Sequence, residues 1–204
     1  MNNSLANTGR MVWAALRMLL ALTVVTGIVY PLVVTGIGQA AFHGKADGSL
    51  LKVDGKEVGS KLIGQSWNIK GTDKPDPKWF QPRPSNSSYD PLSTGSSQLS
   101  AGNPKLVQMV DNAEKQVADF NSVPRSEVPK DAVTGSASAI DPDISPAYAR
   151  IQADRVAKAN RLPLAQIRKL VEDHVTGRDL GFMGEPRVNV LELNIALRDL
   201  AVKH

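Results

Sequence analysis

Residues 18–41 read MLLALTVVTGIVYPLVVTGIGQAA and contain no charged side chain. An α-helix of this length is roughly 36 Å long, at about 1.5 Å per residue. The hydrocarbon core of a bilayer is about 30 Å thick, so this helix can cross it with some tilt. Trp13 and Arg17 precede the run, and their amphipathic side chains suit a membrane interface. The sequence predicts a transmembrane helix over residues 12–41, with its apolar core at about 18–38.

A cleaved signal peptide is the alternative interpretation, because Gln39-Ala40-Ala41 offers small residues for cleavage. Two features favour an uncleaved anchor. The apolar run is longer than the usual stretch of about 7–15 residues, and Pro31 lies in its middle.

The flanking charges predict the orientation. Arg10 and Arg17 precede the span, and no acidic residue occurs before Asp47. Basic residues near the end of a span favour the cytoplasmic side. We therefore expect a short cytoplasmic N-terminus, residues 1–11, in the cytoplasmic (inner) membrane. Residues 42–204 should form one soluble domain on the periplasmic or extracellular side.

Small and polar residues interrupt the span. Glycines let another helix approach closely, and a proline leaves a backbone carbonyl that lipid cannot satisfy. Glycine and proline are also common in ordinary membrane helices. The sequence favours packing against partner helices through six residues: Gly27, Tyr30, Pro31, Gly36, Gly38 and Gln39.

Composition excludes several functions for the chain of 204 residues. Its formal net charge is only +4, and no cluster of Lys and Arg with interleaved aromatics is present, which argues against nucleic-acid binding. The chain has no cysteine, which rules out disulfides and thiolate metal ligands.

The region after the span combines strand and helix signals, which predicts an α+β domain with a few short strands and about four helices. Asp54-Gly55 predicts a tight hairpin turn between strands at 50–53 and 56–58. A Pro- and Ser-rich loop covers residues 66–103. Three further elements are expected to be extended or turned: a strand at 62–65, an extended piece at 128–134 and a turn at 141–143. Helices are expected from Asn103-Pro104, over 145–160, over 163–175 with Gly177 ending it, and from Asn189 onward.

No catalytic or metal-binding motif emerges. The three histidines, His43, His174 and His204, lack an i, i+4 partner, and neither a P-loop nor a nucleophile elbow is present. We expect no catalytic residue, no metal site and no cofactor bound by this chain. An anchored hydrolase is thereby disfavoured. An anchored binding module for envelope sugars or peptides stays open, and it would use Trp67, Trp79, Phe80 and Tyr89.

The ordered motifs resemble those of the C subunits of bacterial potassium-transporting Kdp ATPases, over nearly the whole length. They include Tyr30-Pro31-Leu32, Gly48-Ser49-Leu50, Leu62-Ile63-Gly64-Gln65, Phe80-Gln81-Pro82-Arg83-Pro84-Ser85, Asn103-Pro104, Ile144-Ser145-Pro146, Arg155-Val156-Ala157-Lys158-Ala159 and Val188-Asn189-Val190-Leu191-Glu192-Leu193-Asn194.

The resemblance implies a non-catalytic subunit of a high-affinity potassium uptake pump that uses ATP and K⁺. Its implied partners are the channel-like KdpA, the P-type ATPase subunit KdpB and the small KdpF. The subunit would stabilise the complex and support ATP binding as a catalytic chaperone, a role linked to the position of Gln152. A comparison with the ABC-transporter signature loop falls on residues 134–138, where the glycine is displaced. The expected topology places Gln152 outside, away from cytoplasmic ATP, which opposes direct nucleotide contact.

Overall fold

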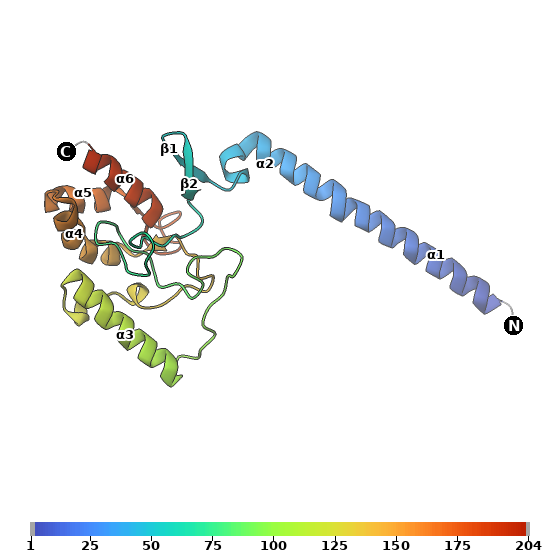
Figure 1. The fold of residues 1–204 in the computed structure, drawn as a ribbon. Helices are drawn as coiled ribbons and strands as arrows, with labels where there is room; N and C mark the ends of the chain where they lie inside the picture. Colours follow the sequence, from blue (N-terminus) through green and yellow to red (C-terminus); the bar gives the residue numbers. More distant parts are fainter. Residues whose placement is uncertain (1–2, 203–204) are drawn as a thin grey trace. The chain divides into compact units, whose positions relative to one another are not determined.

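The computed structural model describes residues 3–202. The chain divides into two units, Met1–Ser49 and Leu50–His204. The first is helical, and the second is a compact domain (Figure 1).

The helical unit is long and apolar, but it is not a uniform α-helix. Helix α1 covers Asn3–Val24, a π-helical turn covers Val25–Val29, and α2 covers Tyr30–Ala46. Within the helical stretch Ala6–Ala46, an 18-residue window reaches a mean hydropathy of 2.2, so the stretch is long and apolar enough to cross a membrane. The prediction of one N-terminal spanning helix is confirmed.

The π turn is the local adjustment that Pro31 requires. Proline has no backbone N–H to donate to the preceding turn. The N–H of Tyr30 bonds the carbonyl of Val25, five residues back. The wider turn accommodates the proline without breaking the helix.

The hairpin of the compact domain forms as predicted. Strand β1, Leu50–Val53, pairs antiparallel with β2, Lys56–Ser60, with a bulge between Leu51 and Lys52. Asp54 and Gly55 both have positive φ, 51° and 76°, as a type I′ turn requires.

The expected strand at 62–65 is wrong. The segment forms a turn, and Gly64 donates its N–H to the carbonyl of Ile140. A Cβ at Gly64 would lie 2.6 Å from the carbonyl oxygen of Asp141. This close backbone approach, rather than strand pairing, explains the glycine.

Four α-helices follow, and the predicted cap residues begin three of them. Helix α3 covers Pro104–Asn121 and α4 covers Pro146–Asn160, with the side chains of Asn103 and Ser145 accepting backbone N–H bonds. Helix α6 covers Val190–Val202, and Asn189 accepts from the N–H of Glu192 at 3.1 Å. The α+β fold is thereby confirmed.

Helix α5 is shorter than expected. It covers Leu164–Asp173, and the next two residues form strand β4, Val175–Thr176. The expected helix end near Gly177 is wrong because β4 pairs with β5, Arg187–Asn189. Strand pairing overrides the helical periodicity of the sequence.

Two other local expectations also fail. Residues 141–143 do not form only a turn, because β3, Asp143–Ile144, adds to the far side of β5 and completes the antiparallel order β3-β5-β4. The expected extended piece at 128–134 contains a 3₁₀ turn, Lys130–Ala132, which follows another at Arg125–Glu127. Asp131 from the second turn accepts two bonds from Ser145 and ties it to the start of α4.

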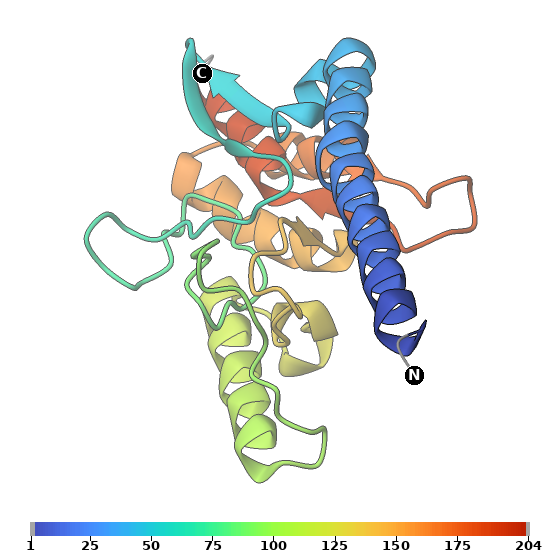
Figure 2. The same cartoon turned by 90° about the vertical axis from the view of Figure 1, so that its right-hand side faces the viewer.

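The core lies between α4, α5, α6 and the loop that carries Phe80. In Figure 1 and Figure 2, α3 lies at the end of the domain opposite the β1–β2 hairpin. The fully buried large apolar side chains come from these four parts and from β5: Phe80, Val156, Ile167, Val171, Val188, Leu193 and Leu197.

Candidate functional site

The side chain of Gln152 on α4 is fully buried, with 0% exposure. Its Oε1 accepts the backbone N–H of Gln81 at 2.7 Å, and its Nε2 donates to the carbonyl of Gln81 at 3.0 Å. The same Oε1 accepts from the guanidinium of Arg155 at 2.7 Å. Both ends of the amide are therefore engaged inside this chain.

Asn194 on α6 holds the neighbouring residue in the same way. Its Oδ1 accepts the N–H of Phe80 at 2.9 Å, and its Nδ2 donates to the Phe80 carbonyl at 3.0 Å. Gln152 and Asn194 thus clamp the peptide groups of two successive loop residues. A buried backbone group without a partner is costly, so the two amides satisfy a segment that has no strand beside it. We call this arrangement the amide clamp.

Arg155 extends the amide clamp toward α3 and the loop. Its Nε donates to Asn121 at 2.9 Å, and one terminal nitrogen donates to the carbonyls of Pro77 and Trp79 at 2.6 and 3.0 Å. Its Cζ lies 4.4 Å from the ring centroid of Phe120, a cation–π distance. Burial lowers the pKa of Arg155 to about 10. At neutral pH the guanidinium stays charged and keeps its donors.

The side chain of Gln81 completes the attachment of the loop. Its Nε2 donates to the carbonyls of Trp67 and Asp76 at 2.8 and 3.0 Å. The rings of Trp67 and Trp79 lie 5.3 Å apart and pack against the core. The first part of the predicted loop at 66–103, residues 67–81, is therefore fixed.

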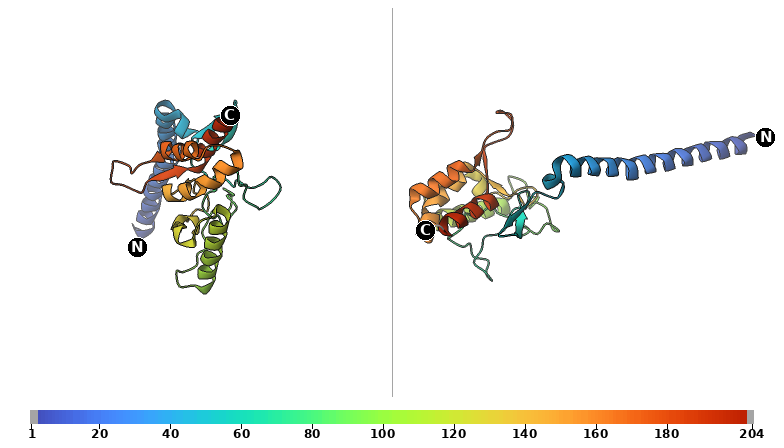
Figure 3. Two further views of the ribbon diagram at one scale, coloured as in Figure 1. Left: turned by 90° about the vertical axis from the view of Figure 1, so that its left-hand side faces the viewer. Right: turned by 90° about the horizontal axis from the view of Figure 1, so that it is seen from above.

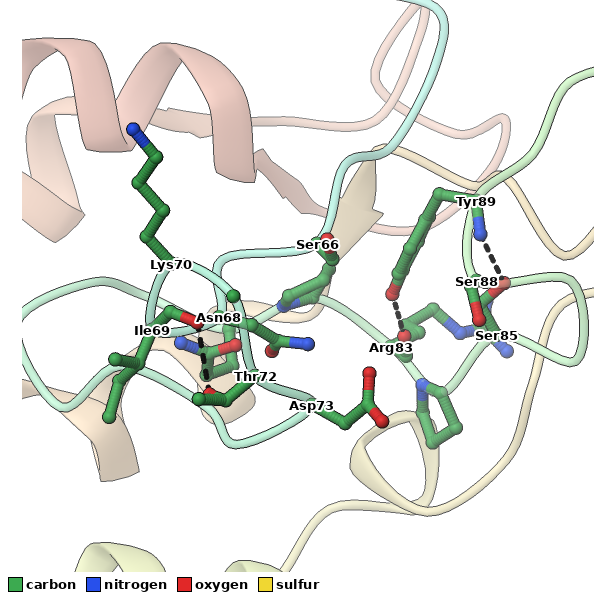
Figure 4. Close-up of a pocket in the computed structure, with 14 residues that line it drawn as sticks. Ser66, Asn68, Ile69, Lys70, Thr72, Asp73, Arg83, Ser85, Ser88 and Tyr89 are labelled. Atoms are coloured by element: carbon green, nitrogen blue, oxygen red, sulfur yellow. Dashed lines mark hydrogen bonds between the residues drawn. The ribbon is translucent and has the colours of Figure 1, made fainter.

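A polar cleft of about 560 Å³ opens beside this segment. Its walls are residues 66, 68–73, 81–85 and 88–89. Arg83 is already paired there, because it bonds Asp141 at 2.9 Å. In Figure 4 the Asp73 carboxylate points toward Arg83, whereas the ammonium of Lys70 points away from the other labelled side chains.

The aromatic residues considered for a binding module have structural positions. Phe80 is fully buried, and Trp67 and Trp79 are partly buried against the core. The hydroxyl of Tyr89 donates to the carbonyl of Arg83. These four residues do not form an exposed aromatic platform for sugars or peptides.

The candidate packing residues of the span lie along the helical unit. An added Cβ at Gly27 or Gly36 would meet no atom within 4 Å, and Tyr30 is 65% exposed. The amide of Gln39 bonds Asp47 at 2.9 Å and His43 at 2.8 Å. Gln39 therefore has partners within its own unit, and helix packing by the six residues stays a prediction.

The family resemblance singled out Gln152, and sequence reasoning missed Gln81, Arg155 and Asn194 as a group connected to it. The available signal was a polar side chain on an otherwise apolar helix face. Asn194 lies beside Leu193 and Leu197, and Gln152 lies beside Ala149, Ala153 and Val156. Residues 134–138 form a loop in which the carbonyl of Thr134 accepts bonds from Arg83.

Across residues 3–202, no group of three His, Cys, Asp or Glu side chains could hold a metal ion. An apolar N-terminal helix that is able to cross a membrane, joined to a compact domain, is the arrangement of a membrane-anchored protein.

The comparisons with known proteins identify the kind of assembly. The family model described as KdpC, K⁺-transporting ATPase, c chain, matches residues 12–199. The chain is 51% identical to the potassium-transporting ATPase KdpC subunit of Streptomyces avermitilis, over 98% of each chain. It is 53% identical to that of Streptomyces coelicolor over 98% of this chain and 97% of the relative, and 46% identical to that of Mycobacterium tuberculosis over 92% and 97%.

The chain therefore belongs to the KdpC family, the C subunits of potassium-transporting ATPases. It is a non-catalytic subunit with a single membrane helix, and other Kdp subunits are its partners.

Proposed function

We propose that this subunit stabilises a high-affinity potassium uptake pump from the outer side of the membrane and supports ATP turnover from there. Its helix would pack on the channel-like KdpA, and its compact domain would abut the ion entrance of that subunit. KdpB would use ATP on the cytoplasmic side, and KdpF would complete the membrane part. The observation that most directly supports this proposal is the family match, which includes both the span and the compact domain.

The orientation is part of this proposal. Arg10 and Arg17 are the only charged residues in the first forty-four, which supports a cytoplasmic N-terminus. A reporter enzyme active only outside the cytoplasm, fused after residue 204, should be active. The same reporter fused after Arg10, without the span, should be inactive. Activity in the reverse pattern would contradict the orientation.

If the chain is a subunit of the pump, it should purify together with other subunits of the pump. Mild-detergent purification of the tagged full-length chain from membranes should recover the channel-like and ATPase subunits. Recovery of a lone monomer would instead support the alternative of an anchored binding module.

The amide clamp supports an indirect effect on ATP. Gln152 is fully buried, and its amide already bonds Gln81 and Arg155. Nucleotide contact would require breaking these bonds, and the proposed topology separates Gln152 from cytoplasmic ATP. A subunit can change affinity at a distant site when it contacts two states of its partner differently. Gln152 would then contribute by holding the domain in its folded shape.

Nucleotide binding to the isolated cytoplasmic ATPase domain tests this mechanism. Addition of the purified outer domain, unaltered or with Gln152→Ala, should leave nucleotide affinity unchanged. In the assembled complex, an effect of about 1–3 kcal/mol is typical of coupling between sites. Strong enhancement that depends on Gln152, between the two soluble pieces alone, would contradict the indirect mechanism.

A further inference from the structure

The segment that joins β4 to β5 presents three large apolar side chains to solvent. Leu180 is 83% exposed, Phe182 71% and Met183 50%. We call these three residues the apolar tip. Figure 2 and both views of Figure 3 show this orange-red segment extending away from the helices of the compact domain. Clustered exposed apolar groups are uncommon on a soluble surface unless something binds them.

The apolar tip is built on an ordered turn. Asp179 and Met183 exchange both backbone hydrogen bonds, each at 2.9 Å. Gly181 donates its N–H to the carbonyl of Arg178 at 3.1 Å. These bonds fix the direction in which the apolar side chains point.

Leu180 adopts a backbone conformation that leucine disfavours. Its φ is +54°, in the left-handed region where glycine and asparagine are usual. The sequence places a bulky apolar residue there, at a cost in local strain as well as in exposure. Backbone strain and apolar exposure of this kind are kept in proteins at positions where the residue serves binding.

The charges around the apolar tip are paired. Arg178 bonds Glu185 at 2.7 Å, and Arg187 lies 3.3 Å from Asp143 and 3.6 Å from Asp179. Lipid-binding surfaces combine apolar area with cations that are available to anionic headgroups. An apolar centre with a neutralised polar rim instead matches the anatomy of a protein–protein contact.

We propose that the apolar tip inserts into an apolar pocket on the outward-facing surface of another subunit of the ATPase. This rests on the proposed function, because the compact domain and that surface must lie on the same side of the membrane.

Photocrosslinking in intact membranes identifies the occupant. A benzophenone amino acid replaces Phe182 in the full-length chain, and the same probe replaces Leu92 as a control. Leu92 is 95% exposed and lies elsewhere in the domain. Illumination should crosslink position 182, but not position 92, to another subunit of the pump. Crosslinking of position 182 to lipid alone, or to nothing, would overturn the proposal.

Leu180→Asn separates binding from folding. Asparagine tolerates a left-handed backbone, so the thermal stability of the full-length chain should be equal or higher. Removing one buried leucine contact from an interface should weaken subunit retention about tenfold or more. Leu92→Asn should leave retention unchanged.

With Leu180→Asn, two results would overturn the proposal. One is that the Leu180→Asn chain retains its partner subunits as well as the unaltered chain does. In that case the proposed function would still hold, because the unaltered chain recovers its partners. The other is a lower thermal stability of Leu180→Asn, which would assign the leucine a structural role. If the unaltered chain recovers no partner, the proposed function fails as well.

Discussion

Replacing Gln152 by alanine removes both arms of one amide from the core. Three buried groups lose their partner: the N–H and the carbonyl of Gln81, and one donor of Arg155. The side chain has 0% exposure, so water does not reach these groups without a rearrangement. The Asn194 half of the amide clamp stays in place and limits how far the loop can move.

The expected loss follows from these three groups. A buried polar group left without a partner costs about 1–3 kcal/mol. Partial relaxation of the loop reduces the sum, so we expect a loss of about 3–5 kcal/mol in the free energy of unfolding. Since domains are stable by about 5–15 kcal/mol, this is a large fraction. At about 2–4 °C per kcal/mol, the midpoint of thermal unfolding should fall by roughly 6 to 20 °C.

Tryptophan fluorescence during heating of the full-length chain in detergent measures this loss. Trp67 and Trp79 lie in the segment held by Gln81, so their emission reports on the loop. Gln116→Ala is the matched control, because Gln116 is exposed on α3 and its removal should change stability by less than about 0.5 kcal/mol. A midpoint for Gln152→Ala equal to that of the control would refute the structural role of the amide clamp.

Two further predictions concern glycines. Gly64→Ala should lower the free energy of unfolding by about 1–3 kcal/mol, because the new Cβ would lie 2.6 Å from the Asp141 carbonyl oxygen. Denaturant titration measures this loss, and Gly102→Ala is the control because an added Cβ there meets nothing within 4 Å. Replacing both Gly36 and Gly38 by leucine should reduce the recovery of partner subunits in mild detergent, because bulky side chains prevent close helix approach; an intact complex would show that these glycines are not at a helix contact.

Sequence reasoning located the elements whose signals are local. Asp54-Gly55 defines its turn by the backbone angles that these residues tolerate. Asn103 and Ser145 cap their helices through side-chain bonds to residues two or three positions away. In each case the residues that decide the structure are neighbours in the chain.

The sequence-based predictions failed where contacts between distant segments determine the local structure. Val175 fits a helical stripe, but pairing with Val188 places it in a sheet. The contacts of the amide clamp are also distant, since Gln152 lies 71 positions from Gln81 and Asn194 lies 114 positions from Phe80. A buried glutamine and an exposed one have the same helical propensity, so the local sequence cannot distinguish them.

The π turn at Val25–Val29 rotates the side-chain positions of the following helix about the helix axis. An α-helix rotates by about 100° per residue, and a π turn accommodates one residue more than a regular turn does. A helical wheel drawn straight through the span would therefore assign residues 30–41, up to the kink at Phe42, to faces that are wrong by roughly a quarter turn. Alignments with membrane helices that lack this turn need a one-residue gap, and chimeras made within it must preserve the residue count.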